Sequence, residues 1–327
     1  MSTLLTTPTT SNPAHTLALA QQAQPFLAAQ NSWLASIPYP LSLLLPTESQ
    51  EKWVSTENLF LACLRTGAHN QAYILLSTLI ARFGKTNDHV LALQGLYQEA
   101  VAGDDQKELG EVLAAYDGVL KDDRTIFAVR KRRAALLRSM GRQSEAMEAL
   151  ISIVDDSATD AEAWAELADL YREQGAYEQA IFCLEECLLT TPQAWNMHAK
   201  LGEVLYASAQ KLESAEQAKP LAEAMRRFCR SIELCDDYLR GYYGLRLATG
   251  HLLEVPPPAG GKRNGADGEL APPKLETVKK LHGLATAKLG EIVRRGGSGE
   301  KGWDGYSEAE LKAAREVMEG DRQKVER

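Results

Sequence analysis

Positive charge is missing from the start of this 327-residue chain, whose first Lys or Arg is Lys52. A secretory signal needs a positively charged beginning, and a mitochondrial transit peptide is rich in arginine, so neither is expected here. The chain also lacks an Asn-X-Ser/Thr glycosylation site, and its cysteine count of five is odd. These absences predict a cytosolic protein with reduced thiols.

Long apolar runs and a basic surplus are missing as well. The longest candidate run, residues 41–45, is far shorter than the roughly 20 residues that span a bilayer. The net charge of −8 argues against general nucleic-acid binding. None of the six histidines lies beside a Ser or Cys in a recognisable nucleophile motif, so the sequence predicts no enzyme.

Small residues recur at a spacing of 34 positions along the middle of the chain. The pairs are Ala134 and Ala168, Gly141 and Gly175, and Ala146 and Ala180. This period and these residue types are typical of the tetratricopeptide unit, a hairpin of two helices. One such hairpin cannot bury its apolar face alone, so it stacks on its neighbours. The spacing predicts an all-α, right-handed superhelical solenoid of tetratricopeptide repeats with N- and C-terminal helical caps, which holds partner proteins.

The unit at residues 161–194 shows the expected packing most clearly. Its first helix carries one apolar stripe, made of Trp164, Leu167, Leu170 and Tyr171. Ala168 is small where the two helices approach, and Gly175 lies at the turn, where a positive φ is easily adopted. Ala180 and Leu184 face back from the second helix, and Pro192 ends it.

Composition divides the chain into five expected segments. They are residues 1–13, disordered; 14–52, an N-terminal helical cap; 53–250, the solenoid; 251–273, a Pro/Gly-rich loop; and 274–327, C-terminal helices. The cap helix is expected to break at Pro25. The first hairpin is expected to begin with a helix at 56–65, and a Gly-rich break is expected at 296–302. About ten extra residues, 207–216, interrupt the fifth hairpin.

Charge is divided unevenly along the solenoid. Residues 121–142 hold eight Lys/Arg against two Asp, whereas residues 145–186 hold twelve acids and one base, Arg172. Adjacent hairpins of opposite charge predict a polarised surface that orients a partner. Two solvated helix faces that stabilise each other are the alternative interpretation.

In tetratricopeptide proteins the first helices of the hairpins line the partner-binding groove. Applied to this chain, that rule selects a groove formed by Lys131, Arg138, Arg142, Glu162, Asp169, Arg172, Asn196, Glu203 and Tyr206. Some chaperone adaptors hold a terminal carboxylate through asparagines in this groove. Ala135 and Glu166 stand at the corresponding positions, so such an adaptor is not expected.

Two other patterns resemble sites without meeting their requirements. Cys183 and Cys187 lie one helical turn apart, but zinc needs about four ligands and no second pair is near, so buried packing is expected. Residues 297–302 match G-x-G-x-x-G, yet they follow a helix instead of a strand, which excludes a dinucleotide site. No cofactor and no metal are therefore expected.

The apolar residues near the N-terminus allow two interpretations, a membrane contact or a cap over the first hairpin. They are Leu17, Leu19, Phe26, Leu27, Trp33, Leu34, Ile37 and Tyr39. The absence of Lys and Arg removes attraction to anionic lipid, which favours the cap.

Four stretches together resemble one family, subunit 2 of the endoplasmic reticulum (ER) membrane protein complex. In order they are AAYDGVLKDD (114–123), AVRKRRAALLRSMGR (128–142), EAWAELADLYREQGAYEQAIFCLEECLLTTP (162–192) and RRFCRSIELCDDYLRGYYGLRLA (226–248). The resemblance covers roughly residues 59–248. Members of the family are cytosolic tetratricopeptide subunits without catalytic residues.

The resemblance implies a peripheral scaffold on the cytosolic face of the ER membrane, without a transmembrane segment, cofactor, nucleic acid or small-molecule substrate. Such a scaffold supports insertion of tail-anchored and multi-pass proteins. It holds cytosolic parts of transmembrane subunits and binds a soluble cytosolic subunit. A generic tetratricopeptide adaptor that binds a short peptide motif remains the alternative.

Overall fold

The computed structural model describes residues 2–5, 13–35, 50–214, 216–255, 273–298 and 306–325. The chain forms two compact units, Met1–Ala149 (unit 1) and Leu150–Arg327 (unit 2), and the boundary falls within α8 (Gln143–Asp156). Every regular element in the described ranges is a helix. The predicted all-α tetratricopeptide solenoid is confirmed.

Unit 1 is built from helical hairpins that follow a short N-terminal segment. Its elements are η1 (Ser2–Leu5), α1 (Pro13–Gln21), α2 (Ala23–Ala35), α3 (Gln50–Arg65), α4 (His69–Phe83), α5 (Asp88–Ala102), α6 (Gln106–Asp122) and α7 (Phe127–Ser139). Side chains fix two of the helix starts, because Asn87 and Asp105 accept hydrogen bonds from the first free amides of α5 and α6. Helix α3 begins six residues earlier than the expected 56–65.

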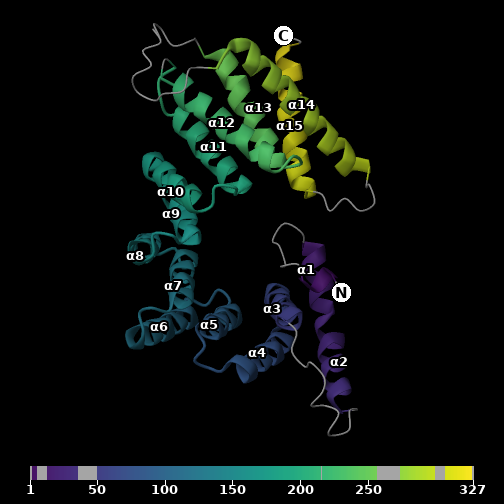
Figure 1. Ribbon diagram of the computed structural model, residues 1–327, viewed down its shortest axis with the longest axis vertical. Helices are drawn as coiled ribbons and strands as arrows, with labels where there is room; N and C mark the ends of the chain where they lie inside the picture. Colours follow the sequence, from purple (N-terminus) through teal and green to yellow (C-terminus); the bar gives the residue numbers. More distant parts are fainter. Residues whose placement is uncertain are drawn as a thin grey trace. The chain divides into compact units, whose positions relative to one another are not determined.

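Each hairpin of unit 1 packs on the next. Helix α3 contacts α4, and α5 contacts α6, so consecutive helices form pairs (Figure 1). Between pairs, α4 contacts α5, and α7 contacts both α5 and α6. This pattern lets apolar faces be shared by neighbouring hairpins, which is how a solenoid builds a continuous core.

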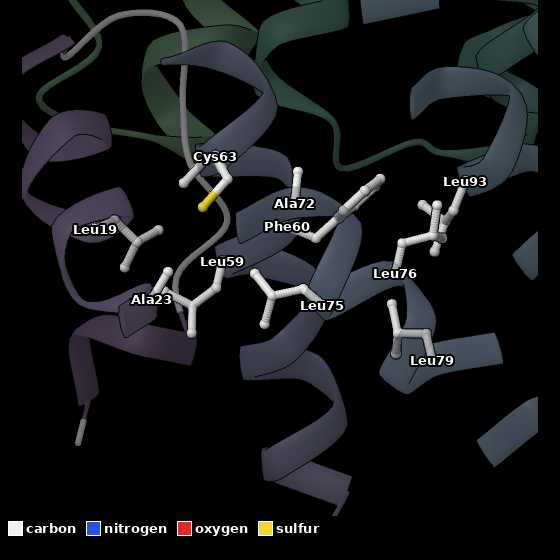
Figure 2. Close-up of a cluster of buried hydrophobic side chains, with 11 residues drawn as sticks. Leu19, Ala23, Leu59, Phe60, Cys63, Ala72, Leu75, Leu76, Leu79 and Leu93 are labelled. Carbon is white, nitrogen blue, oxygen red and sulfur yellow. The ribbon is translucent and has the colours of Figure 1, made fainter. Parts of the chain in front are cut away.

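The N-terminal helix α1 covers the first hairpin. Leu19 of α1 and Ala23, the first residue of α2, are buried in one cluster with Leu59, Phe60 and other residues of α3 and α4 (Figure 2). Leu17 on the opposite side of α1 is exposed. The side chains of Phe26 and Leu27 are packed against the same cluster, whereas those of Trp33, Leu34, Ile37 and Tyr39 lie outside the described residues.

The expected break at Pro25 is wrong by three residues. The two helices separate at Gln22, and Pro25 lies in the first turn of α2. Proline is tolerated there because the amides of a first turn have no partner within the helix.

Unit 2 continues the hairpin pattern to the C-terminal helices. Its complete elements are α9 (Ala161–Glu173), α10 (Tyr177–Thr190), α11 (Trp195–Ala209), α12 (Ala218–Leu234), α13 (Leu239–Glu254), α14 (Leu275–Ser298) and α15 (Glu308–Val325). Helices α9 and α10, and α11 and α12, pack as hairpins, and α12 contacts α13 (Figure 1). The extra residues of the fifth hairpin fall at the end of α11 and in its connection to α12.

The residues selected by the 34-residue spacing occupy matching environments. Ala134 and Ala168 are each 1 % exposed, and the glycines at the two turns, Gly141 and Gly175, have φ of 75° and 74°. A side chain at such a φ would be strained, which accounts for glycine at both turns. The buried residues also include Ala146, Leu167, Ala180 and Leu184; Trp164 and Tyr171 are half-buried, and Pro192 is exposed.

The last hairpin pairs α13 with α14 across the Pro/Gly-rich segment. Buried Arg246 on α13 joins all three C-terminal helices. Its guanidinium donates to the Val317 carbonyl of α15 at 2.6 Å and to the Thr286 hydroxyl of α14 at 3.1 Å. The expected Gly-rich break at 296–302 is wrong at its start, because α14 continues through Gly297 to Ser298.

Candidate protein-docking face

The first helices of the hairpins are α3, α5 and α7 in unit 1, and α9, α11 and α13 in unit 2. We call the surface they present in each unit its first-helix face. In unit 1 this face contains a hollow of about 590 Å³. Residues of α3, α5, α7 and the start of α6 line it, including Leu61, Arg65, Leu96, Glu99, Arg132 and Ser139.

A buried polar cluster lies at the hollow of unit 1. The Tyr116 hydroxyl donates to Glu99 Oε1 at 2.5 Å, and the Arg132 guanidinium donates to Glu99 Oε2. Burial, followed by the neighbouring charge of Glu99, raises the pKa of Tyr116 far above its usual range. A Cβ atom at Gly95 would lie 2.2 Å from the Tyr116 ring, so the tyrosine fits only because that residue is glycine.

The three basic groove residues predicted in unit 1 are engaged within the chain. Lys131 and Arg138 lie half-buried on α7, and each interacts with other residues. Arg142, at the turn after α7, is exposed, and its Nε donates to Glu145 Oε1 at 2.6 Å. The surplus positive charge of residues 121–142 is therefore partly neutralised by acids on both sides of the segment, a point the charge count missed.

In unit 2 an ion-pair network joins α9 to α11. Lys200 Nζ on α11 donates to Asp169 Oδ2 on α9 at 2.7 Å. Arg172 Nε lies 3.8 Å from Asp169 Oδ1, one turn along α9. Asp169 and Arg172 were both predicted groove residues, and the structure brings them together. Lys200 was not among the predicted residues.

Glu203 lies on α11, one turn after Lys200, and is part of the first-helix face of unit 2. Its side chain reaches solvent, yet desolvation raises the pKa of its carboxyl. The positive charges of Arg240, Arg172 and Lys200 oppose that shift without cancelling it. Ionisation of Glu203 therefore costs stability.

Aromatic rings continue the same face from α11 to α13. The rings of Tyr206 and His251 meet edge-on, with centroids 5.9 Å apart. The two remaining predicted groove residues, Glu162 and Asn196, are exposed near the starts of α9 and α11. The face thus presents charged groups over α9 and α11 and aromatic groups over α11 and α13, an arrangement suited to an extended protein segment.

The cysteines of the hairpin cores are buried thiols. Cys187 Sγ donates to the Ala161 carbonyl at 3.4 Å. Burial, with a smaller contribution from Glu186, raises the pKa of Cys183 to about 12, and burial alone raises that of Cys63 to about 11. Within the part of the chain that the structure describes, no group of three or more His, Cys, Asp or Glu side chains could hold a metal ion.

The polar contacts that the sequence analysis missed share a simple spacing. Glu99 and Arg132 are 33 residues apart, and Asp169 and Lys200 are 31 apart. Both spacings are close to one repeat, so each pair joins the first helices of consecutive hairpins. A search for opposite charges about one period apart would have found both pairs.

Residues 86–218 match a protein family described as "EMC2 TPR-like repeat domain". The chain is 35% identical to the TPR repeat protein oca3 of Schizosaccharomyces pombe, over 63% of this chain and 69% of that protein. It is 31% identical to ER membrane protein complex subunit 2-A of Xenopus laevis, over 71% of this chain and 74% of that protein. The chain belongs to the ER membrane protein complex subunit 2 family. This is the family that the four ordered stretches indicated.

The family extends to distant relatives. The Saccharomyces cerevisiae subunit 2 is 25% identical over 57% of this chain and 65% of that protein. This family of tetratricopeptide proteins is non-enzymatic. The matched region of the family domain runs from just before α5 to the first residue of α12, and so includes residues of both units. Across the described helices, none combines the length and apolarity that crossing a membrane requires.

Proposed function

We propose that this chain is the tetratricopeptide scaffold subunit of an ER membrane protein complex and works without catalysis or a cofactor. It sits peripherally on the cytoplasmic face of the ER membrane. There it holds cytosolic parts of the transmembrane subunits and a soluble partner subunit, and so supports insertion of tail-anchored and multi-pass proteins. Membership of the subunit 2 family carries this proposal.

The first-helix faces are the surfaces that we assign to these partners. In unit 2, Asp169, Lys200 and Arg172 form a network at the surface, and Glu203 is kept where its charge is unfavourable. A desolvated carboxyl does not stabilise the fold, whereas on a binding surface it is a strong hydrogen-bond acceptor for a partner's N–H groups. In unit 1, Lys131, Arg138 and Arg142 are the corresponding basic residues.

A charge swap on α9 tests this assignment. Glu162→Lys combined with Arg172→Glu exchanges two exposed charges without altering the net charge. The matched control is Glu276→Lys with Lys280→Glu, which exchanges an exposed ion pair on α14. Tagged chains are purified from a native membrane extract, and the recovered membrane subunits are quantified. The α9 swap is expected to lower recovery about tenfold, or about 1.4 kcal/mol of binding, and the α14 swap to leave it unchanged.

Reversal of Lys131, Arg138 and Arg142 to Glu is expected to weaken the same assembly while circular dichroism still shows a folded chain. Equal recovery with all variants would remove the first-helix faces from the proposal. Recovery of a single weakly held peptide, with no membrane subunits, would favour the generic adaptor instead.

A further inference from the structure

Helix α10 leaves a row of side chains exposed on the side opposite its buried residues. Phe182, Glu185 and Leu189 follow one another at i, i+3 and i+7, so they form a single row, which we call the α10 stripe. Phe182 is 55% exposed and Leu189 is 75% exposed. No other large hydrophobic side chain among the described residues is as exposed as Leu189.

The repeat itself shows that the fold does not require these apolar residues. In the preceding unit, 34 residues earlier, Glu148 stands at the position of Phe182 and Asp155 at the position of Leu189. Both acids are exposed in α8. The same kind of second helix therefore forms with charged side chains at both positions.

The fifth hairpin leads to the same conclusion. Its second helix, α12, places buried Ala224 and Phe228 where α10 has Ala180 and Leu184. In that register the two apolar positions of the α10 stripe correspond to Arg226 and Glu233, which are again charged. Two hairpins of the chain thus serve as internal references for a second helix without an exposed apolar row.

Packing within the hairpin accounts for only part of the row. The Phe182 ring meets the Trp164 ring of α9 edge-on, with centroids 6.0 Å apart, and still exposes more than half of its surface. Trp164 in turn donates its indole N–H to the Ala158 carbonyl at 2.9 Å. Large apolar side chains held in place and left open to solvent are typical of contact sites for other proteins.

Negative charge surrounds the stripe. Helix α10 carries Glu178, Glu185 and Glu186 and has no Lys or Arg between residues 177 and 190. Arg227 of α12 approaches Glu185 at 3.7 Å and marks one margin of the acidic area. An acidic surface favours a basic partner and repels an anionic membrane.

We propose that the α10 stripe docks a basic amphipathic helix of a partner protein. Apolar side chains of that helix cover Phe182 and Leu189, and its Lys or Arg side chains pair with Glu178 and Glu185. The 14 residues of α10 extend about 21 Å, which is long enough for four turns of a partner helix. This inference does not depend on the first-helix faces, because it uses a different surface and different residues.

Two model peptides of about 18 residues test the proposal, each with leucines along one helical face. One carries lysines on the other face and the second carries glutamates. Binding to the purified full-length chain is measured by fluorescence anisotropy. The lysine peptide is expected to bind at least about tenfold more tightly than the glutamate peptide, which corresponds to about 1.4 kcal/mol.

The decisive variant places the residues of α8 on α10, as Phe182→Glu with Leu189→Asp. It is expected to weaken binding of the lysine peptide at least about tenfold. The matched control is Leu275→Asp with Leu284→Glu on α14, which removes two exposed apolar side chains of the same unit and leaves binding unchanged. Equal affinity for the α10 variant and the original chain, or an equal loss in the control, would overturn the proposal.

Leu189→Asp alone guards against a folding defect, since it leaves the Phe182–Trp164 contact in place, and it is expected to weaken peptide binding at least about threefold. A photo-crosslinking residue at position 189, in a native membrane extract, then identifies the natural occupant. A basic amphipathic helix of another protein supports the proposal. A crosslink to lipid, to a second copy of this chain, or to nothing contradicts it. None of these outcomes bears on the α9 charge-swap experiment.

Discussion

Glu99 in unit 1 and Asp169 in unit 2 each pair with a cation on the first helix of the next hairpin, about one repeat further along the chain. Glu99 is 13% exposed and also accepts a hydrogen bond from Tyr116 on a second helix, so its carboxylate joins three helices. Asp169 and Lys200 are 22% and 26% exposed, and the third member, Arg172, comes from α9 itself. In unit 1 the ion pair is therefore part of the packing between helices, because Tyr116 of a second helix joins it. In unit 2 the ion pair involves first helices only and forms a network at the surface.

The largest effect is expected from Glu99→Ala. It removes the acceptor of both the Tyr116 hydroxyl and the largely buried Arg132 guanidinium, and should lower the free energy of unfolding by about 3 kcal/mol. Urea unfolding followed by circular dichroism measures the loss, and hydrogen exchange in peptides of α5 to α7 localises it. If the loss is no greater than that of Asp169→Ala, the contrast between the two carboxylates is wrong.

Ala168→Leu tests what the two units have in common. Ala168 is buried in α9, which packs against α10, so the extra carbons should overpack the hairpin and cost about 1–3 kcal/mol. Ala134→Leu should cost a similar amount in unit 1, since both positions are 1% exposed. Ala165→Leu, at a half-buried position of the same helix, is the control and should change the melting temperature little. An unchanged melting temperature for Ala168→Leu would contradict the shared packing register.

Asp169→Ala should have a smaller effect on stability than on binding. Partly exposed ion pairs contribute about 0–1 kcal/mol, so a loss of roughly 0.5 kcal/mol is expected in urea unfolding. High salt should reduce this loss further, because screening weakens an accessible pair. A loss as large as that of Glu99→Ala would mean that Asp169 is a packing residue.

The smallest change is expected from Glu203→Gln, and its sign is opposite. Because its pKa is raised in the folded protein, protonated Glu203 favours the folded state, and this contribution is lost as the pH rises through the folded pKa. Removing the charge should raise the melting temperature at about pH 7 and have little effect below about pH 4, near the ordinary pKa of Glu. Glu162→Gln, at an exposed position, is the control and should not raise the melting temperature at neutral pH. A lower melting temperature of Glu203→Gln at neutral pH would show that its charge stabilises the fold.

The sequence placed the hairpin of α9 and α10 correctly within residues 161–194 because several local signals agree there. Asp160 caps the start of α9, an apolar stripe follows, Gly175 marks the turn and Pro192 follows the end of α10. Elsewhere single signals misled. Glycines at the end of α14 and the proline in α2 were taken as breaks, yet helices tolerate glycine and accept proline in their first turn.

The helices of the candidate site were predictable from local patterns, whereas its contacts between helices depend on residues about one repeat apart. Asp169 and Arg172 lie one turn apart on α9, so periodicity alone places them together. Lys200 reaches Asp169 because α11 lies beside the preceding hairpin, and Lys200 was not among the predicted groove residues. The Glu99 cluster depends on Tyr116 crossing from α6, a contact that no local pattern encodes. Arg246 similarly gained its partners on α14 and α15 only through tertiary packing.

The buried thiols provide a separate chemical probe of local opening in each unit. A thiol reacts as its thiolate, and the raised pKa values of Cys63 in unit 1 and Cys183 in unit 2 keep that form scarce while the hairpins stay closed. Alkylation at either residue therefore requires the surrounding helices to separate. Labelling rates resolved by mass spectrometry would report how often each unit opens, one residue at a time, in the same tube and on the same chain.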